Sequence, residues 1–351
     1  MLLSIAQFGA SLAKYDPKDG HYHTIGLMGP DEFHERLPGA QKPGFKDNAY
    51  TNILLAWTLV KALEVLDILP PQHKTRLFRK LGLTNKAIEK WEDISRRMNV
   101  SIDKDGVIEQ FDGYFGLKEL DWDGYRAKYK NIMRMDRILK AEGKSPNEYK
   151  VAKQADVLML FYVLSVSEVR ELLNRMGYKF HKNTLKKNYN YYARRTSHGS
   201  TLSKVVHCYI AHLIGKKTEV WKWFLEVLKS DVYDTQGGTT LEGIHAGVMA
   251  GSVDVAIRGF AGISFSGDII RIQPDIPQAL ECVKLKLQYR NIWFQVCITK
   301  DRVTVYIKRT GSRKRKVTIE ICGKTHRFST GRTYSVPVVG LNRSSRGRSL
   351  K

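Results

Sequence analysis

The stretch AYTNILLAWTLVKALEVLDIL, residues 49–69, would carry apolar side chains on nearly every side of a helix. A helix that is apolar all round lies inside a larger helical assembly rather than on its surface. Pro70 and Pro71 follow at once, and they end the helix because proline cannot donate the next backbone hydrogen bond. Residues 49–69 therefore predict a buried helix in a fold that is mainly α.

Similar patterns predict further helices on both sides of this one. The opening MLLSIAQFGASLAKYDP lacks the positive start of a signal peptide, so we interpret it as a helix of the fold. The segment 99–152 is aromatic and charged with little periodicity until DGYRAKYKNIMRMDRILKAEG, residues 123–143, and we interpret it as an extended excursion that covers one face of the helical body. The other predicted helices are residues 85–98, 155–164, 165–176, 183–193, 203–214, 219–229 and 241–258.

The apolar pattern changes its period after residue 268. Apolar and polar residues then alternate, which is typical of strands in an antiparallel meander or small sandwich. Glycines and prolines between residues 262 and 277 mark the change. The sequence thus predicts a helical domain over residues 1–262 and a small antiparallel β domain over residues 263–340. The basic, serine-rich residues 341–351 are expected to be a disordered tail.

Composition narrows the classes of function. Lys and Arg number 58 against 35 Asp and Glu, and the net charge of +23 attracts anions such as nucleic acid, acidic membranes or phosphate. No apolar run reaches the roughly 20 residues that span a bilayer. The four cysteines show no CxxC spacing, so no disulfide framework is predicted. A cytoplasmic protein without a membrane partner is expected.

The motif GLMGPDEFHE, residues 26–35, gathers two kinds of group that handle protons, carboxylates and a histidine. A carboxyl group between the apolar Met28 and Phe33 would lose water, and this would raise its pKa so that it keeps a proton as a general acid does. The alternative is that Asp31 caps a turn and Glu32 faces water, as charged loop residues usually do.

A second candidate, KQAD at residues 153–156, precedes the apolar run VLMLFYVL. Lys153 and Gln154 offer hydrogen-bond donors that suit sugar hydroxyls. The alternative is an ordinary first turn of a helix, in which Asp156 complements the helix dipole.

A third candidate, RTSHGSTLS at residues 195–203, enters a helix. A loop of Gly, Ser and Thr there presents backbone N–H groups and hydroxyls to one point, which suits phosphate, and nearby arginines would help. The spacing matches no P-loop or dinucleotide motif. The alternative is a simple helix cap formed by Ser203.

His245 is a fourth candidate, in the first turn of a helix of small residues. Such a histidine is usually a satisfied core residue, although beside a phosphate loop it would bind the anion as a cation. A metal site is not predicted, because the histidines lack the i, i+4 pairing with a third ligand that zinc needs.

These blocks, together and in order, resemble glycoside hydrolase family 65, which holds the inverting maltose, trehalose, kojibiose and nigerose phosphorylases. The matching blocks are GLMGPDEFHE, DNAYTN, KQADVLMLFYVL, RTSHGSTLS and TTLEGIHAGVMAGSVD. The resemblance implies the C-terminal part of an (α/α)6 barrel followed by a small β domain. The family's N-terminal β-sandwich and its Trp-Asp segment have no counterpart here, so we expect a C-terminal portion that is inactive alone.

The resemblance also implies roles for six residues: a general acid, two sugar contacts and three phosphate ligands. These are, in that order, Glu32; Lys153 and Gln154; and Ser200, Thr201 and His245. Family members usually have two serines at the positions of Ser200 and Thr201, and the hydroxyl is retained here. Asp47 stands where asparagine is frequent, which changes the hydrogen bonds available there.

The implied activity is phosphorolysis of an α-linked glucose disaccharide to β-glucose 1-phosphate, with inorganic phosphate as co-substrate and no cofactor. The implied partners are the disaccharide and phosphate, together with either a second copy of the chain or another chain that supplies the N-terminal half. A trehalase-like hydrolase is the nearest alternative, although it needs a carboxylate base that HGSTLS does not offer. An inactive fragment is another alternative. Nucleic-acid binding is favoured only by the charge, since no helix-turn-helix, finger or RRM signature is present.

Overall fold

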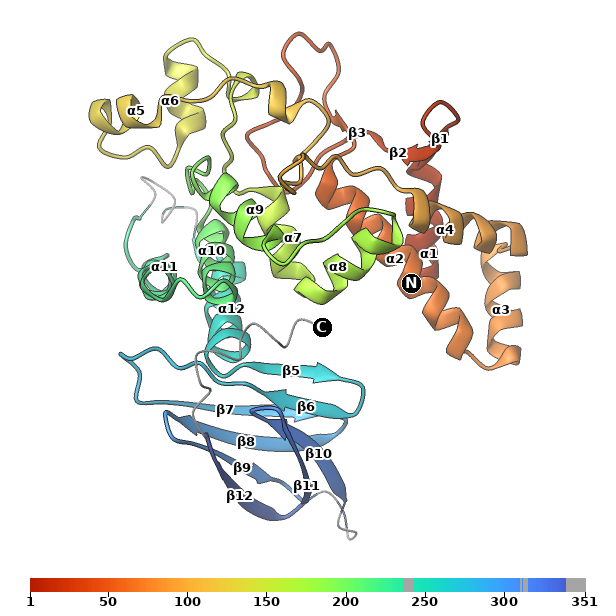
Figure 1. Cartoon of the computed structure of the whole chain (residues 1–351), viewed down its shortest axis with the longest axis vertical. Coiled ribbons are helices and arrows are strands. Elements are labelled where there is room, and N and C mark those ends of the chain that lie inside the picture. Colours follow the sequence, from red (N-terminus) through yellow and green to blue (C-terminus); the bar gives the residue numbers. More distant parts are fainter. Residues whose placement is uncertain (236–240, 242, 310, 312–314, 339–351) are drawn as a thin grey trace. The chain divides into compact units, whose positions relative to one another are not determined.

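The structure, a computed structural model, describes residues 1–235, 241, 243–309, 311 and 315–338. The chain is mainly helical and ends in a small β domain, as predicted (Figure 1). Its residues form two compact units. Unit 1 comprises Met1–Ile210 and Asp234–Leu241, and unit 2 comprises Ala211–Tyr233 and Glu242–Lys351. The predicted tail, residues 341–351, lies outside the described residues.

The predicted central helix of unit 1 is α2 (Ala49–Ile68). The side chain of Asn48 caps it by accepting a hydrogen bond from the backbone N–H of Thr51. Helix α2 contacts α1, α4, α7 and α8, and this explains its apolar surface. The other helices of unit 1 are α1 (Leu2–Leu12), α3 (Pro71–Leu81), α4 (Asn85–Arg97), α5 (Trp122–Lys128), α6 (Met135–Ala141), α7 (Asp156–Val163), α8 (Val166–Arg175) and α9 (Thr184–Ala193). Helix α10 (Thr201–Leu213) begins in unit 1 and ends in unit 2.

Helix α3 and the helices of segment 99–152 were not predicted. The two prolines do end α2, but Pro71 then begins α3, because proline suits the first position of a helix. Segment 99–152 contains α5 and α6, which lie side by side (Figure 1), and the short 3₁₀ turns η1 (Tyr114–Gly116) and η2 (Pro146–Glu148). Tyr125 of α5 and Leu139 of α6 share a small core with Phe33 of the GLMGPDEFHE motif. This core fixes one side of the loop that carries Glu32.

Two short antiparallel sheets hold the N-terminal region. One pairs β1 (Lys14–Asp16) with β2 (His21–His23), and the other pairs β3 (Ile25–Leu27) with β4 (Phe45–Lys46). Because β3 and β4 pair, the loop from residue 28 to residue 44 is closed at its base. Glu32 therefore lies on a loop with a fixed beginning and end.

Unit 2 contains α11 (Lys217–Lys229), α12 (Ala246–Asp254), a π-helical turn η4 (Val255–Phe260) and the β domain. The helix predicted over residues 241–258 begins later than expected. Gly243 has a positive φ of 99°, and the backbone N–H of His245 is bound by a side chain, so regular helix starts only at Ala246.

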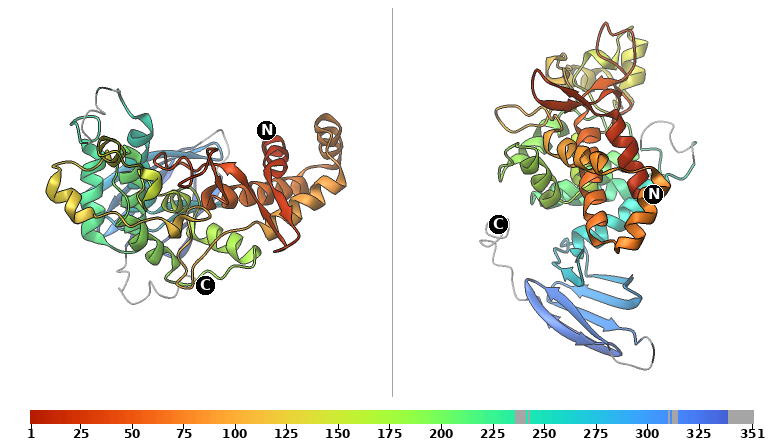
Figure 2. Two further views of the ribbon diagram at one scale, coloured as in Figure 1. Left: turned by 90° about the horizontal axis from the view of Figure 1, so that it is seen from above. Right: turned by 90° about the vertical axis from the view of Figure 1, so that its right-hand side faces the viewer.

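The β domain consists of two four-stranded sheets, in the orders β11-β10-β6-β5 and β12-β9-β8-β7. The right-hand view in Figure 2 shows these strands as one group. Neighbouring strands are antiparallel, as predicted, except that β6 and β10 are parallel. The chain leaves β6 for the other sheet and returns to it at β10, so both strands run the same way. The strands are β5 (Ile263–Ser266), β6 (Ile269–Ile272), β7 (Cys282–Tyr289), β8 (Ile292–Thr299), β9 (Arg302–Ile307), β10 (Lys316–Ile321), β11 (Lys324–Ser329) and β12 (Arg332–Pro337).

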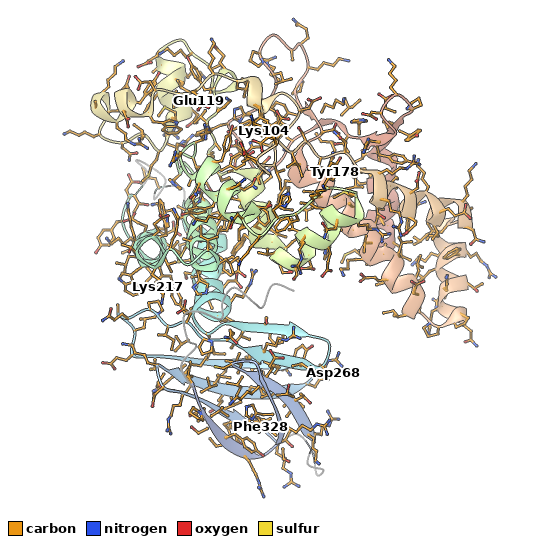
Figure 3. All side chains as sticks on the ribbon, viewed as in Figure 1. Lys104, Glu119, Tyr178, Lys217, Asp268 and Phe328 are labelled. Atoms are coloured by element: carbon orange, nitrogen blue, oxygen red, sulfur yellow. The ribbon has the colours of Figure 1, made fainter. Side chains whose placement is uncertain are left out.

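The core of the β domain follows the alternation that predicted its strands. On β8, Phe294 and Ile298 are buried, whereas Gln295 between them is exposed. Phe328 of β11, labelled in Figure 3, belongs to the same core. Within the described part of the chain, no helix has the length and apolar character needed to cross a bilayer.

Replacing Phe294 by alanine is expected to destabilise the β domain. The side chain is 1% exposed, so its removal leaves a cavity that costs about 3–5 kcal/mol of unfolding free energy. Gln295→Ala, one position along the same strand on the exposed face, should change stability by no more than about 0.5 kcal/mol. Chemical denaturation of both variants measures this, and equal losses would contradict the assignment of the core face.

Candidate active site

The Glu32 side chain forms an ion pair with Lys153. Glu32 Oε2 lies 2.8 Å from Lys153 Nζ, which comes from the loop before α7. The Glu32 side chain is 68% exposed and that of Lys153 only 18%. The expected loss of water around Glu32 is therefore not found, and the alternative in which it faces water is correct. Adjacent residues in the loop point to opposite sides, and here Asp31 is the one that points inward.

Asp31 is buried and is held by donors from several segments. Its Oδ1 accepts the backbone N–H of Lys153 at 2.9 Å. Its Oδ2 accepts a hydrogen bond from Gln110 Nε2 at 2.9 Å and is 3.1 Å from His34 Nδ1. Its own backbone N–H donates to Asp156 Oδ1 at 2.6 Å. Asp31 thus does more than cap a turn, because it joins the Glu32 loop to the Lys153 segment.

Asp156 is the second buried carboxyl group of the site. It is the first residue of α7, as the helix-dipole alternative predicted, and its Oδ2 accepts a hydrogen bond from Asn48 Nδ2 at 2.7 Å. Burial, and then the nearby charge of Asp31, raise the pKa of Asp156 well above its usual range. Asp156 therefore favours its protonated form, and its Oδ1 binds the backbone of the residue next to Glu32.

Gln154 binds the same loop from the other side. Its Nε2 donates to the carbonyl oxygen of Pro30 at 2.8 Å, and the residue is only 7% exposed. Its Oε1 is buried and has no hydrogen-bond partner among the described residues. Gln154, predicted as a sugar contact, is thus first of all a support for the Glu32 backbone, with one acceptor atom left over.

The loop that was predicted to bind phosphate lies beside Lys153. Ala152 and Thr196 form a parallel bridge, and the backbone N–H of Ser197 donates to Ala152 O at 2.9 Å. A Cβ atom on Gly199 would lie 3.2 Å from Lys153 Cγ and 3.2 Å from Phe33 Cζ. Only glycine allows such a close approach. The bridge and this contact bring the segments of Glu32, Lys153 and Gly199 together.

Ser200 and Thr201 lie at the start of a long helix. Helix α10 begins at Thr201, so Ser203 lies inside the first turn and the alternative in which it caps the helix is wrong. Ser203 Oγ instead lies 3.0 Å from His198 Nδ1. The first N–H groups of α10 are thus next to the hydroxyls of Ser200 and Thr201, an arrangement that suits an anion.

Arg195 does not assist this loop in the expected way. Its guanidinium group binds the carboxylate of Glu119, labelled in Figure 3, through Nη2 at 2.8 Å and Nε at 3.1 Å. A third hydrogen bond joins Nη1 to the carbonyl oxygen of Tyr191 at 2.9 Å. Arg195 is therefore a structural contact of segment 99–152.

His245 belongs to unit 2, whereas the other five predicted site residues belong to unit 1. It is the residue immediately before α12. Its Nδ1 lies 2.6 Å from Asp231 Oδ1, and its backbone N–H donates to Asp231 Oδ2 at 2.6 Å. Asp231 thus fixes both the backbone and the ring of His245.

Asp47 departs from the family pattern, and both oxygens of its carboxylate make contacts within the protein. Its buried carboxylate lies 2.6 Å from His23 Nδ1 and accepts hydrogen bonds from Asn52 and Asn99 at 3.1 and 2.8 Å. Asp16, Asp19 and His23 also bring metal-ligand atoms within 4.8 Å of one another. The second ring nitrogen of His23 already binds Asp19 at 2.9 Å, so contacts within the protein account for this group.

The supporting residues were not predicted as parts of a site. Asp31 and His34 lie inside the GLMGPDEFHE motif, and Asp156 lies two residues after Gln154, so their positions in the sequence could have indicated that they belong to the site. Nothing in the sequence indicated a role for Gln110, because it lies in a segment without periodicity. The contact between Asp31 and Asp156 joins residues 125 positions apart, and no local pattern indicates it.

Comparison with protein families gives two matches that together cover most of the chain. Residues 1–254 match the central catalytic domain of glycosyl hydrolase family 65. Residues 263–328 match the C-terminal domain of the same family. A human-microbiome protein assigned as a kojibiose phosphorylase has a similar structure, with a TM-score of 0.75 and 25% identity over 97% of this chain and 46% of that one.

Curated relatives are similar over 80–96% of the chain. An uncharacterized glycosyl hydrolase of Mycobacterium tuberculosis is 42% identical over 96% of this chain and 25% of its own length. The trehalose 6-phosphate phosphorylase of Lactococcus lactis is 40% identical over 80% of this chain and 35% of its own. The kojibiose phosphorylase of Caldanaerobacter subterraneus is 29% identical over 92% of this chain and 39% of its own length. The chain thus spans between a quarter and two fifths of the length of these relatives.

Replacing Gly29 by alanine is expected to disturb the buried carboxyl pair. A Cβ atom there would lie 1.8 Å from Asp156 Oδ2 and 2.7 Å from Asn48 Nδ2, so the loop must shift at a cost of about 1–3 kcal/mol. Gly116→Ala is the matched control, because its Cβ atom meets nothing within 4 Å. Thermal unfolding compares the two, and a Gly29→Ala variant as stable as the control would refute the close contact.

The raised pKa of Asp156 predicts a pH dependence of stability. The folded protein binds a proton that the unfolded chain releases near the ordinary pKa of 3.8, so this stabilisation is full below that pKa and is lost as pH rises towards the raised value. The Asp156→Asn variant has no titrating group at this position. The stability of the wild type relative to Asp156→Asn should therefore fall as the pH rises above about 4 in urea denaturation. A constant or rising difference would contradict the assignment.

Proposed function

Because the chain belongs to glycosyl hydrolase family 65, we propose that it carries the general acid and the phosphate-binding loop of an enzyme that cleaves an α-linked glucose disaccharide with inorganic phosphate. The observation that carries this proposal is the meeting of Glu32, Lys153 and the loop at Gly199 in unit 1. These three segments hold an exposed carboxyl group, a cation and the start of a long helix in one place. The phosphorylases among the relatives support the same reaction class.

Glu32 is the general acid of the proposed reaction. It protonates the oxygen of the glycosidic bond as that bond breaks, and its exposed side chain leaves it accessible to a substrate. An inverting glycosidase needs a second carboxylate to activate water. A phosphorylase does not, because phosphate is already an anionic nucleophile. Attack from the opposite face inverts the anomeric carbon and gives β-glucose 1-phosphate and a free sugar.

Lys153 and Gln154 position the sugar in this proposal. In the absence of substrate, Lys153 Nζ donates to Glu32. A sugar hydroxyl between them takes one of its N–H donors and leaves the carboxyl group beside the glycosidic oxygen. Gln154 supports this arrangement through its hydrogen bond to the carbonyl oxygen of Pro30, which holds the backbone two residues before Glu32.

Within unit 1, phosphate is held by Ser200 and Thr201. The hydroxyls and the first N–H groups of α10 donate to its oxygens, and the helix dipole favours its negative charge. This scheme uses no metal or organic cofactor.

The proposal extends to the whole enzyme. We interpret the helices as the C-terminal part of an (α/α)6 barrel, which is consistent with the structural similarity to the microbiome protein. A complete glucosyl site then includes a region that the relatives possess beyond the part matched here, supplied by the same chain, by a second copy or by another chain.

The test is a chimera in which this chain replaces the matching region of the Lactococcus lactis enzyme. With α-linked glucose disaccharides, unphosphorylated and phosphorylated, it should release β-glucose 1-phosphate only when phosphate is present. Glu32→Gln should reduce kcat by about 10²–10⁴-fold, since this is what a general acid contributes. Glu35→Gln is the matched control, because Glu35 is an exposed carboxylate of the same motif.

Two outcomes would reject the proposal. Release of free sugar at the same rate with and without phosphate would make the enzyme a hydrolase. Equal activity of Glu32→Gln and Glu35→Gln, both verified as folded by thermal unfolding, would remove Glu32 from the chemistry.

A further inference from the structure

Unit 2 contains a cavity to which none of the predicted site residues contributes. Its volume is about 840 Å³, within the range of roughly 300–1,000 Å³ that small-molecule sites occupy. Its walls are the end of α10, the start of α11, the end of η4, the segment between β6 and β7 and the loop between β8 and β9. All the residues that line it belong to unit 2, so the cavity lies within one compact unit.

The segment between β6 and β7 is held in place by its neighbours. The backbone N–H of Asp275 donates to the carbonyl oxygen of Phe260 at 2.9 Å. Lys300 Nζ, from the loop between β8 and β9, donates to the carbonyl oxygen of Gln278 at 3.0 Å. The wall that carries Asp275 is therefore formed without a ligand.

Trp221 gives the cavity an aromatic wall. It lies on α11 and is partly exposed, and its ring is supported by the ring of Phe224, with the two centroids 5.8 Å apart. Phe224 in turn contacts the buried ring of Phe260 edge-on, with 4.8 Å between the centroids. Ile276 and Pro277 add apolar surface to the lining. A supported aromatic ring with apolar neighbours suits the C–H face of a sugar ring.

The polar part of the lining places a carboxylate between two nitrogen groups. Asp275 Oδ1 lies 3.5 Å from Nζ of Lys217, which is labelled in Figure 3, and Asp275 Oδ2 lies 3.9 Å from His212 Nδ1. Both separations are longer than the roughly 2.7–3.2 Å of a normal hydrogen bond between nitrogen and oxygen. A ligand hydroxyl can donate to the carboxylate and accept from the ammonium group at the same time. This combination of groups therefore suits hydroxyls.

The same lining is less suited to an anion or to a wholly apolar ligand. A phosphate group would be repelled by Asp275, which lies between the two nitrogen groups. A wholly apolar ligand would cover charged groups without pairing them, and this costs free energy. A sugar meets both requirements, because its hydroxyls donate and accept while its ring carbons form an apolar face.

We propose that this cavity binds a neutral sugar, with one face of the sugar ring against Trp221 and its hydroxyls on Asp275 and Lys217. The site is made of residues other than those proposed for phosphorolysis, and the inference does not rest on that proposal. Asp275 is the single acid among the lining residues that the structure describes, whereas inverting hydrolysis takes two carboxyl groups. The site therefore holds the sugar without cleaving it.

Isothermal titration calorimetry with the 351-residue chain tests the proposal. Maltose, a neutral disaccharide, should bind more tightly than glycerol, which has hydroxyls but no ring. Trp221→Ala should weaken the binding of maltose at least about tenfold, since a tryptophan in a binding site often carries much of the affinity. Asp275→Asn keeps the shape of the side chain and should weaken it about fivefold, because hydrogen bonds to charged groups are the stronger ones.

Trp223→Ala is the matched control. Trp223 is a partly exposed tryptophan of the same helix and does not line the cavity, because residues two positions apart on a helix face different sides. Its replacement should leave the Kd of maltose unchanged. Binding that is lost in Trp221→Ala should persist in Lys153→Ala, which alters only the proposed reaction site. Thermal unfolding verifies that each variant is folded, and Asp275→Asn gives the result by itself if Trp221→Ala is not.

Four results would overturn the proposal. Maltose that binds no better than glycerol would mean that the cavity does not recognise a sugar ring. Equal losses in Trp221→Ala and Trp223→Ala would indicate a change in the helix rather than in the cavity. Loss of binding in Lys153→Ala, with binding retained in Trp221→Ala, would assign the sugar to the proposed reaction site. Inorganic phosphate that binds more tightly than maltose, and is lost in Lys217→Ala, would make the cavity an anion site.

Discussion

The buried carboxylate of Asp31 is the contact on which the rest of the site depends. It receives hydrogen bonds from the Lys153 backbone and from Gln110, and its own N–H binds Asp156. Removing a donor from this buried carboxylate leaves an acceptor unsatisfied and costs at least about 1–3 kcal/mol. An exposed pair such as Glu32 with Lys153 contributes only about 0–1 kcal/mol. The buried contacts therefore hold the loop more firmly than the exposed pair does.

Asp31 and Glu32 are adjacent in the sequence but have different roles, one structural and one at the surface of the site. Asp31 points inward and joins two segments, while Glu32 points outward and remains accessible. Gln154 and Asp156 repeat this support from the other segment, through Pro30 and the N–H of Asp31. The backbone before Glu32 is bound at Pro30 and Asp31, which fixes the point from which its side chain extends. A fixed starting point helps a proton donor to meet one oxygen of a substrate.

Local sequence patterns predicted the helices and strands in which apolar residues recur at regular spacing. They predicted the site only in part. Helix α2 and strand β8 follow from their apolar spacing, whereas α3 was missed because Pro71 indicates the end of one helix and the beginning of another equally well. Glu32, Lys153 and the loop at Gly199 were identified from motifs, yet their proximity depends on contacts between distant segments. Burial in a loop is decided residue by residue, and Asp31 took the inner position that was expected for Glu32.

The net charge of +23 by itself says little about the partner. Many of its cations are occupied by carboxylates, as Arg195 is by Glu119 and both Lys128 and Lys144 are by Glu142. Such pairs hold segment 99–152 together and offer little to a ligand. The cations that matter are those that line a cavity with other donors. The net charge alone therefore does not favour a long polyanion over a small phosphate-bearing ligand.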